Sequence, residues 1–151
     1  IEILLIEYSS DHNAYFVDKL SKFHLDFERI HPFADGTGRI GRVLTNFQLL
    51  NISYPRIIIR DKEKADYYVA FKEYDSGRNT KPMERIVALA LIESLQKRIA
   101  FLAGDEIIDL SEWVRQNGLS APAVFNAARR QTIPAFRERG IWKIGKDYEN
   151  K

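Results

Sequence analysis

The feature that most constrains this chain is a twelve-residue stretch, His31 to Arg42, with the sequence His-Pro-Phe-Ala-Asp-Gly-Thr-Gly-Arg-Ile-Gly-Arg. It lies between two segments whose apolar residues recur every three or four positions. Before it these residues are Phe16, Leu20, Phe23, Phe27 and Ile30, and after it they are Ile40, Val43, Leu44, Phe47 and Leu50. The spacing predicts two amphipathic helices, over about residues 13–30 and 40–51, joined by a glycine-rich loop. Because Pro32 disfavours the α conformation in the preceding residue, the first helix should end at His31.

The loop combines groups that suit a polyphosphate ligand. Gly36, Gly38 and Gly41 let backbone N–H groups approach a ligand closely. The next helix adds the unpaired N–H donors of its first turn, and phosphate is the usual anion at such a helix end. Arg39 and Arg42 are three residues apart, so their forked guanidinium donors lie on one side of that helix.

One carboxylate and one imidazole complete the loop. Asp35 would repel a bare phosphate, so its position suits a divalent cation, Mg²⁺, that bridges it to the phosphate oxygens. His31 carries an imidazole that can accept a proton from an incoming hydroxyl. Each group by itself has a simpler explanation, as a turn, a helix cap or a solvated cationic face. Their joint occurrence in one short loop favours phosphate binding with a base nearby.

Further elements are predicted downstream. Residues 57–59 form a short β-branched run, and a third helix is predicted over residues 61–74. A long helix follows over about residues 82–102, with a proline in its first turn. A glycine ends that helix, so we expect one domain over residues 1–103 and a second over residues 104–151. The third helix is expected to carry Ala65, Tyr68 and Phe71 or Lys72 on one face, and Tyr67 and Tyr68 could be core aromatics.

The C-terminal domain is similar to a winged helix-turn-helix. Short helices are predicted over residues 110–116 and 120–130, followed by a hairpin around Gly140. The second helix would then be the recognition helix, and residues 137–140 would be the wing. Between residues 111 and 145 the basic residues exceed the acidic ones by four. Such a module binds DNA or docks a protein, and the sequence favours neither. We expect its small core to contain Trp113, Phe125, Phe136 and Trp142.

Composition excludes several classes of function. The 151 residues contain no cysteine, which excludes disulfides, thiolate catalysis and zinc–thiolate sites. No apolar run reaches the ~18–20 residues of a membrane span, and residues 1–8 lack the basic start of a signal peptide. We therefore expect no membrane partner and a cytoplasmic location. The net charge of +2 is too small to indicate nucleic-acid binding on its own.

The central loop resembles the signature of the Fic (filamentation) family, His-Pro-Phe-x-[Asp/Glu]-Gly-Asn-Gly-Arg-x-x-Arg. Every specified position matches except the Asn, which is Thr37 here. The likeness extends over about residues 1–103. It implies a mainly α fold, a Fic-type helical bundle with the signature loop between two central helices, followed by the small α+β winged-helix-like domain. The family's β-hairpin flap would precede the first helix and is expected to be missing from these residues.

The resemblance also implies an activity and the residues that carry it. Family members mostly transfer AMP from ATP to a Ser, Thr or Tyr hydroxyl of a target protein and release pyrophosphate. His31 would be the catalytic base, Asp35 would hold Mg²⁺, and Phe33 would anchor the loop in the core. The residues implied to bind the nucleotide are Gly36, Thr37, Gly38, Arg39, Arg42, Tyr68 and Asp75.

Two differences from the family pattern bear on activity. Thr37 is β-branched and reaches less far than Asn, and loss of one charge-assisted donor costs on the order of 1.5–3 kcal/mol, so we expect a weakened site. The family also often carries an inhibitory [Ser/Thr]-x-x-x-Glu-[Gly/Asn] helix, whose Glu pairs with the second motif arginine. The nearest match, Thr80 to Glu84, is followed by Arg85. Any such brake is therefore expected upstream or on an inhibitory partner protein.

Three functions are compatible with this pattern. The leading hypothesis is a protein adenylyltransferase that uses ATP and Mg²⁺. The alternative is a DNA-binding transcriptional regulator whose degenerate Fic domain senses a nucleotide. Phosphoryl transfer, as in the Doc branch, is disfavoured because that branch has Ala and Lys where this chain has Gly36 and Gly38.

Overall fold

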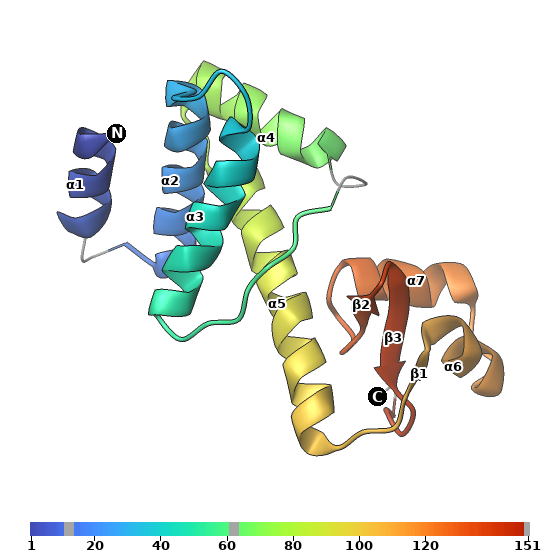
Figure 1. Ribbon diagram of the computed structural model, residues 1–151. Coiled ribbons are helices and arrows are strands. Elements are labelled where there is room, and N and C mark those ends of the chain that lie inside the picture. The colour runs from blue at the N-terminus through green and yellow to red at the C-terminus, as the bar shows by residue number, and fades with distance from the viewer. Residues whose placement is uncertain (11–13, 61–63, 150–151) are drawn as a thin grey trace. The chain divides into compact units, whose positions relative to one another are not determined.

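The computed structural model describes residues 1–10, 14–60 and 64–149, and it divides into two compact units, residues 1–90 and 91–151 (Figure 1). The division falls inside the long helix α5 (Lys81–Ala103). The prediction of a mainly α fold with a small α+β part is confirmed. The helices are α1 (Glu2–Ser10), α2 (Phe16–Ile30), α3 (Thr37–Asn51), α4 (Lys64–Gly77), α5 (Lys81–Ala103), α6 (Leu110–Gln116) and α7 (Ala121–Arg129). The strands are β1 (Ile107–Asp109), β2 (Phe136–Glu138) and β3 (Ile141–Gly145).

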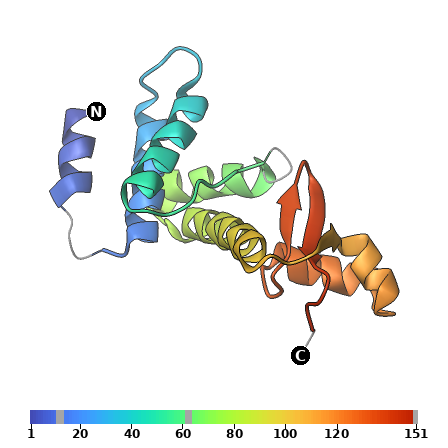
Figure 2. The same ribbon diagram turned by 60° about the horizontal axis from the view of Figure 1, so that its bottom comes forward.

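In the first unit, α2 packs against α3, and the signature loop joins them beyond the ends of both helices (Figure 2). The helix α2 ends where Pro32 predicts. His31 adopts a left-handed conformation with φ 47°, and its N–H still bonds the Phe27 carbonyl at 3.2 Å. Gly36, with φ 83°, turns the chain into α3. The backbone therefore reverses direction at both ends of the segment between α2 and α3. Glycine adopts a positive φ without strain, which suits Gly36 to the second of these positions.

The face that α3 presents to its neighbours differs from the predicted one. Ile40 and Leu44 do pack against a small cluster formed by Leu4, Phe23 and Phe27. The prediction was wrong for the other three apolar positions, because Val43, Phe47 and Leu50 are 65%, 59% and 50% exposed. The buried side of α3 carries Leu49 and otherwise small or polar residues, namely Thr37, Gly41, Thr45 and Gln48. Polar residues of α2 face this side, so periodicity of apolar residues could not identify it.

The buried side of α4 is not the face that carries Ala65 and Tyr68. Its buried residues are Tyr67, Ala70 and Tyr74, whereas Ala65 and Tyr68 are exposed. The predicted start at Asp61 lies outside the described residues. The segment before α4 is extended and runs along α3. Asn46 of α3 holds it there, because its side-chain amide donates to the Ile57 carbonyl at 3.1 Å and accepts from the Ile57 N–H at 2.7 Å.

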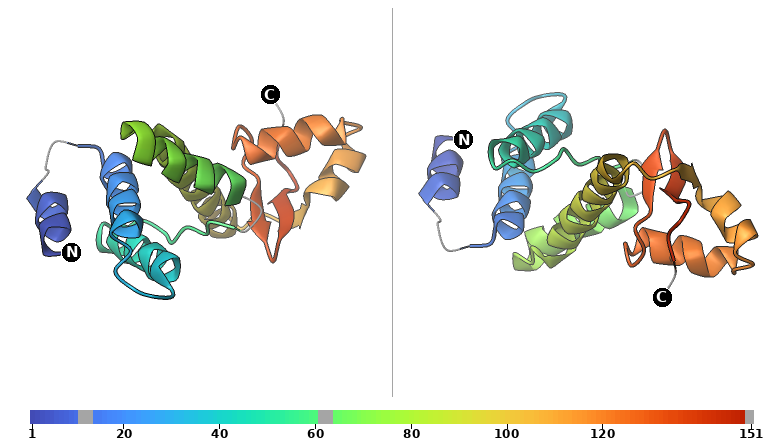
Figure 3. Two further views of the ribbon diagram at one scale, coloured as in Figure 1. Left: turned by 90° about the horizontal axis from the view of Figure 1, so that it is seen from above. Right: turned by 90° about the horizontal axis from the view of Figure 1, so that it is seen from below.

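The second unit contains the end of α5 and a three-stranded antiparallel sheet in the order β1-β3-β2. The predicted hairpin is β2–β3, with Phe136 opposite Lys143, and β1 adds Ile108 opposite Ile144. The strand β1 was missed because three residues give no detectable alternation. The helices α6 and α7 lie on one side of the hairpin (Figure 3). Of the predicted core, Trp113 and Phe136 are fully buried, and Phe125 and Trp142 are partly buried.

None of the helices that the structure describes has both the length and the apolar character needed to cross a bilayer.

Candidate nucleotide site in the signature loop

The loop brings an imidazole and a carboxylate, both exposed, close in sequence to the N-terminus of a helix. His31 is exposed at the end of α2, and α3 begins at Thr37, two residues beyond the exposed Asp35. The N–H of Ile40 is the first in α3 to find an intrahelical partner, the Gly36 carbonyl at 3.0 Å. The N–H groups before it belong to the first turn, where an anion is favoured.

Arg39 lies over this helix end. Its guanidinium bonds the Asp35 carboxylate at 2.8 Å, and one of its nitrogens is 3.2 Å from the position that a Cβ on Gly36 would take. Both side chains are mostly exposed, at 72% and 91%. An exposed pair of this kind is worth about 0–1 kcal/mol. A phosphate that binds Arg39 and a cation that binds Asp35 can therefore separate them at little cost.

The side chains around Asp35 could hold a magnesium ion only if a bound phosphate supplied further oxygen ligands. Among the described residues, no group of three or more His, Cys, Asp or Glu side chains comes together. Mg²⁺ is commonly held by one or two carboxylates plus the phosphates of a substrate, so the single carboxylate of Asp35 next to an anion-binding helix end fits that arrangement.

Thr37 does not point its hydroxyl at this surface. The residue is 2% exposed, and its Oγ1 donates to the Phe33 carbonyl at 3.0 Å. Its single hydroxyl proton is thus used inside the loop, which leaves the Thr37 backbone N–H as the group available to an anion. Phe33 anchors the loop only partly, because its ring is 6.4 Å from that of Phe27 and 40% of the residue remains exposed.

A buried polar network lies beneath the loop and was not predicted. His24 is 1% exposed, with Nδ1 3.2 Å from Thr45 Oγ1 and Nε2 hydrogen-bonded to the Tyr67 hydroxyl. Burial lowers the pKa of His24 to about 4, so the ring is neutral at pH 7. Burial raises the pKa of Tyr67, and the nearby positive charge of Arg42 opposes this rise. The sequence held one indication of this network, because His24 and Glu28 lie four residues apart among the apolar residues of α2.

Glu28 and Arg42 complete this network. A Cβ on Gly38 would be 3.2 Å from Glu28 Oε1 and 3.5 Å from an Arg42 terminal nitrogen, and a Cβ on Gly41 would be 2.8 Å from Glu28 Oε1. The two glycines therefore make room for a carboxylate and a guanidinium behind the loop. Burial raises the pKa of Glu28, while Arg42 and His31 lower it.

The two predicted nucleoside contacts lie on α4. Tyr68 and Asp75 are seven residues apart, which places them on the same side of the helix two turns from each other. Tyr68 is 66% exposed. Asp75 is 3.7 Å from Arg29, two residues before His31, so it lies near the start of the loop.

The nearest match to an inhibitory motif has another use. Thr80 donates to Glu84 at 2.6 Å, and Lys81 pairs with the same carboxylate at 2.6 Å. Partial burial raises the pKa of Glu84, but these two contacts lower it by more, so the pKa lies below its usual value. The contacts that the structure records for Glu84 thus stabilise the beginning of α5 and do not include Arg42.

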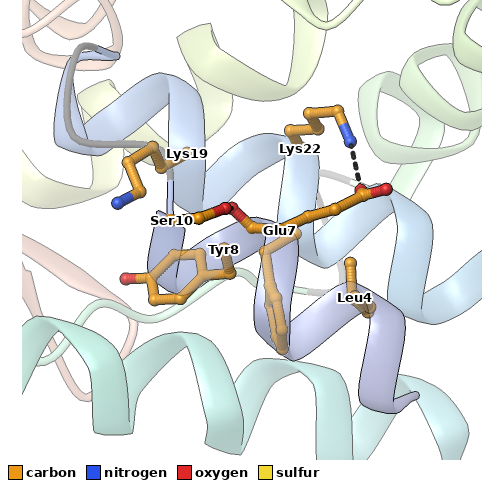
Figure 4. A pocket seen from close by; sticks show the side chains of 7 residues that line it. Leu4, Glu7, Tyr8, Ser10, Lys19 and Lys22 are labelled. Atoms are coloured by element: carbon orange, nitrogen blue, oxygen red, sulfur yellow. Dashed lines mark hydrogen bonds and ion pairs between the residues drawn. The ribbon is translucent and has the colours of Figure 1, made fainter.

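A separate hollow lies between α1 and α2 (Figure 4). Its lining includes Glu7 and Lys22, whose charged groups are 3.6 Å apart, and Tyr8, whose ring has the Lys19 ammonium 4.8 Å from its centre. None of the residues that line it belongs to the signature loop. We therefore assign no part of the loop's chemistry to it.

In the second unit, several charges of the predicted wing are paired. Arg137 binds Glu93 of α5 at 2.6 Å, with side chains only 16% and 8% exposed. Lys97 of α5 holds Glu138 at 2.7 Å, and Lys143 pairs with Asp109 at 2.5 Å. The local basic excess therefore overstates the charge that this unit can offer to DNA.

Comparison with known proteins assigns the loop and the helices around it to a family. The Fic/DOC family model matches residues 2–49. "Protein adenylyltransferase Fic" of Nematostella vectensis is 34% identical over 87 residues, which is 58% of this chain and 19% of the relative. The proteins of the same name from Drosophila sechellia and Drosophila melanogaster are each 33% identical, over 131 and 127 residues. They cover 80% and 78% of this chain, which spans 25% and 24% of their length. The chain belongs to the Fic/DOC family.

Proposed function

We propose that this chain transfers AMP from ATP to a hydroxyl side chain of a target protein, Ser, Thr or Tyr. The observation that carries this proposal is the loop geometry, in which an exposed imidazole precedes the anion-binding start of α3 and its two arginines. The names of the similar proteins support the same chemistry.

In the proposed reaction, the phosphates of ATP bind at the start of α3. The N–H groups of Gly36, Thr37 and Gly38 surround the phosphate oxygens, and Arg39 and Arg42 contact the outer phosphates. These cationic and N–H groups stabilise the charge that grows on the departing pyrophosphate. Because the Thr37 hydroxyl is used by Phe33, the site has one donor fewer than a motif Asn would supply, and we expect it to bind ATP more weakly.

His31 is the proposed general base. Its imidazole accepts the proton of the target hydroxyl, the hydroxyl oxygen bonds the α-phosphorus, and the bond from that phosphorus to the bridging oxygen of pyrophosphate breaks. Asp35 would hold Mg²⁺, which would supply positive charge to stabilise the phosphate oxygens. Tyr68 and Asp75 would contact the nucleoside from α4.

The test is transfer of a label from ATP. The chain, Mg²⁺ and ATP labelled at the α-phosphate are incubated with a cell lysate and with the chain alone. We expect a labelled protein band, a loss of 10²–10⁴-fold in its rate for His31→Ala, and little change in ATP affinity. ATP labelled at the γ-phosphate is the control, and it should give no band that depends on adding this chain. A γ-labelled band that appears with the unchanged chain and disappears with His31→Ala would indicate phosphoryl transfer instead, and an undiminished rate of α-labelling for His31→Ala would exclude His31 as the base.

We propose DNA binding by the second unit as the other candidate function. The order α5, β1, α6, α7 and the β2–β3 hairpin supports a winged-helix interpretation. Arg129 and Arg130 are exposed at the end of α7. Binding to duplex DNA should weaken steeply between 50 and 200 mM salt, and the double substitution Arg129→Ala/Arg130→Ala should reduce that salt dependence. Binding that ignores salt and this substitution would favour a protein-docking role.

A further inference from the structure

The arginine at the end of the signature loop is connected to a buried chain of hydrogen bonds whose direction can be derived. Thr45 Oγ1 donates its only proton to the Gly41 carbonyl at 3.0 Å, so it can only accept from His24 Nδ1. His24 therefore carries its proton on Nδ1, which leaves Nε2 as an acceptor. The Tyr67 hydroxyl must then donate to Nε2.

This direction leaves the Tyr67 oxygen with lone pairs and no proton to give. A guanidinium has only donors, so Arg42 is the partner that such an oxygen suits. Arg42 lies within interaction range of Tyr67, and both its charge and a hydrogen bond oppose the rise in the Tyr67 pKa. The chain thus runs from Arg42 of α3 through Tyr67 of α4 and His24 of α2 back to α3.

Glu28 competes for the same guanidinium. Its Oε1 and a terminal nitrogen of Arg42 both approach Gly38, at 3.2 and 3.5 Å from the position that a Cβ would take there. Within the described residues, no group hydrogen-bonds this buried oxygen. A buried carboxylate oxygen without a partner favours any movement that brings a guanidinium to it. Such a movement would draw Arg42 behind the loop and away from a phosphate in front of it.

We propose that Tyr67, oriented by His24, is a positioning residue that holds Arg42 toward the phosphates and away from Glu28. The inference rests on the proposed function, in which Arg42 binds the outer phosphates of ATP. Neither Tyr67 nor His24 touches the nucleotide in this account. Both act through the orientation of the guanidinium.

The first test removes only the hydroxyl. We expect Tyr67→Phe to weaken the binding of Mg–ATP, measured by calorimetry, by about tenfold, the size of one hydrogen bond to a charged group. The matched control is Tyr74→Phe, since Tyr74 is the other buried tyrosine of α4 and its hydroxyl donates to Asp26 of α2 at 2.6 Å. This control should bind Mg–ATP as the unchanged chain does. Equal binding by Tyr67→Phe and the unchanged chain would overturn the proposal.

Two double variants separate positioning from a general structural effect. In an Arg42→Ala background, Tyr67→Phe should change the affinity less than twofold, because there is no guanidinium to hold. Adding Glu28→Gln to Tyr67→Phe should restore most of the lost affinity, because the competing charge is gone. A tenfold loss that persists without Arg42, or that Glu28→Gln leaves unchanged, would refute the mechanism.

A readout without nucleotide keeps the inference independent of the proposed reaction. The Nε–Hε signal of Arg42 in an NMR spectrum should be sharp in the unchanged chain and in Tyr74→Phe, and shifted or broadened in Tyr67→Phe. If Tyr67→Phe does not fold, His24→Asn replaces it, because an Asn amide keeps the donor toward Thr45 and loses the acceptor toward Tyr67. An unaltered Arg42 signal in these variants would overturn the inference. Absence of ATP binding and labelling in the unchanged chain would instead overturn the proposed function.

Discussion

Arg137 in the second unit and Arg39 in the first unit differ in whether the fold already uses their charge. Arg137 of the second unit is partly buried and pairs with the buried Glu93, and its guanidinium lies 4.6 Å from the centre of the Trp142 ring. Arg39 of the signature loop is 72% exposed and pairs with an exposed aspartate. One cation is neutralised inside the fold, whereas the other can change partners. The number of basic residues is therefore a poor guide to a binding surface, because the fold decides which of them already have a partner.

The largest effect expected from this comparison is on stability. Replacing Arg137 by Ala leaves Glu93 buried without its guanidinium partner, which should lower the free energy of unfolding by about 3–5 kcal/mol. Denaturant unfolding measures this change. The control is Lys146→Ala, because the pair of Lys146 with Glu106 is exposed and should be worth about 0–1 kcal/mol. Similar values for the two variants would mean that the buried pair is not a stabilising element.

The second effect is a dependence of stability on pH in the first unit. Burial lowers the pKa of His24 from 6.5 to about 4. Above pH 6.5 the ring is neutral in both states, and the stability is complete. As the pH falls from 6.5 toward 4, the unfolded chain takes up a proton that the folded chain does not, so the free energy of unfolding should fall by about 3 kcal/mol.

The protonation of Glu28, whose pKa burial raises, works in the opposite direction and offsets part of this loss. Unfolding is therefore compared between pH 7 and 4.5 for the unchanged chain and for His24→Asn, which cannot titrate at that position. The variant should lack most of the slope that His24 contributes. Parallel pH profiles for the two proteins would contradict the assignment.

A smaller effect is expected at the threonine of the signature loop. Thr37→Val keeps the shape of the side chain and removes its bond to the Phe33 carbonyl, which should lower the free energy of unfolding by about 1 kcal/mol. The affinity for Mg–ATP should stay within twofold, because the hydroxyl is turned away from the phosphate surface. A large loss of affinity with unchanged stability would show that the hydroxyl reaches the nucleotide.

The smallest effect on stability is expected where the largest effect on binding should occur. Asp35→Asn breaks only an exposed pair, so the free energy of unfolding should change by less than about 1 kcal/mol. The Mg²⁺-dependent part of ATP binding should nevertheless disappear, which calorimetry with and without Mg²⁺ would measure. Arg137→Ala and Asp35→Asn thus separate a cation used by the fold from a carboxylate kept for a ligand.

Most of the helices and the place of the loop could be predicted from the sequence, because these depend on local rules. Pro32 ends α2 at His31, and the apolar periods of α2 and of the helices α5 to α7 give their approximate bounds. The loop residues that carry chemistry are likewise adjacent in the chain. Their proposed roles come from the family pattern and stay predictions.

Only the tertiary structure decided which side of α3 and α4 is buried and which polar groups meet there. His24, Thr45 and Tyr67 come from three helices, and Arg137 and Glu93 are 44 residues apart. Contacts of this kind leave no period in the sequence, since each residue looks locally like an ordinary surface or helix position. By itself, the sequence determined where a nucleotide site is expected. The packing of distant helices determined which charges the fold neutralises and which remain available to a ligand.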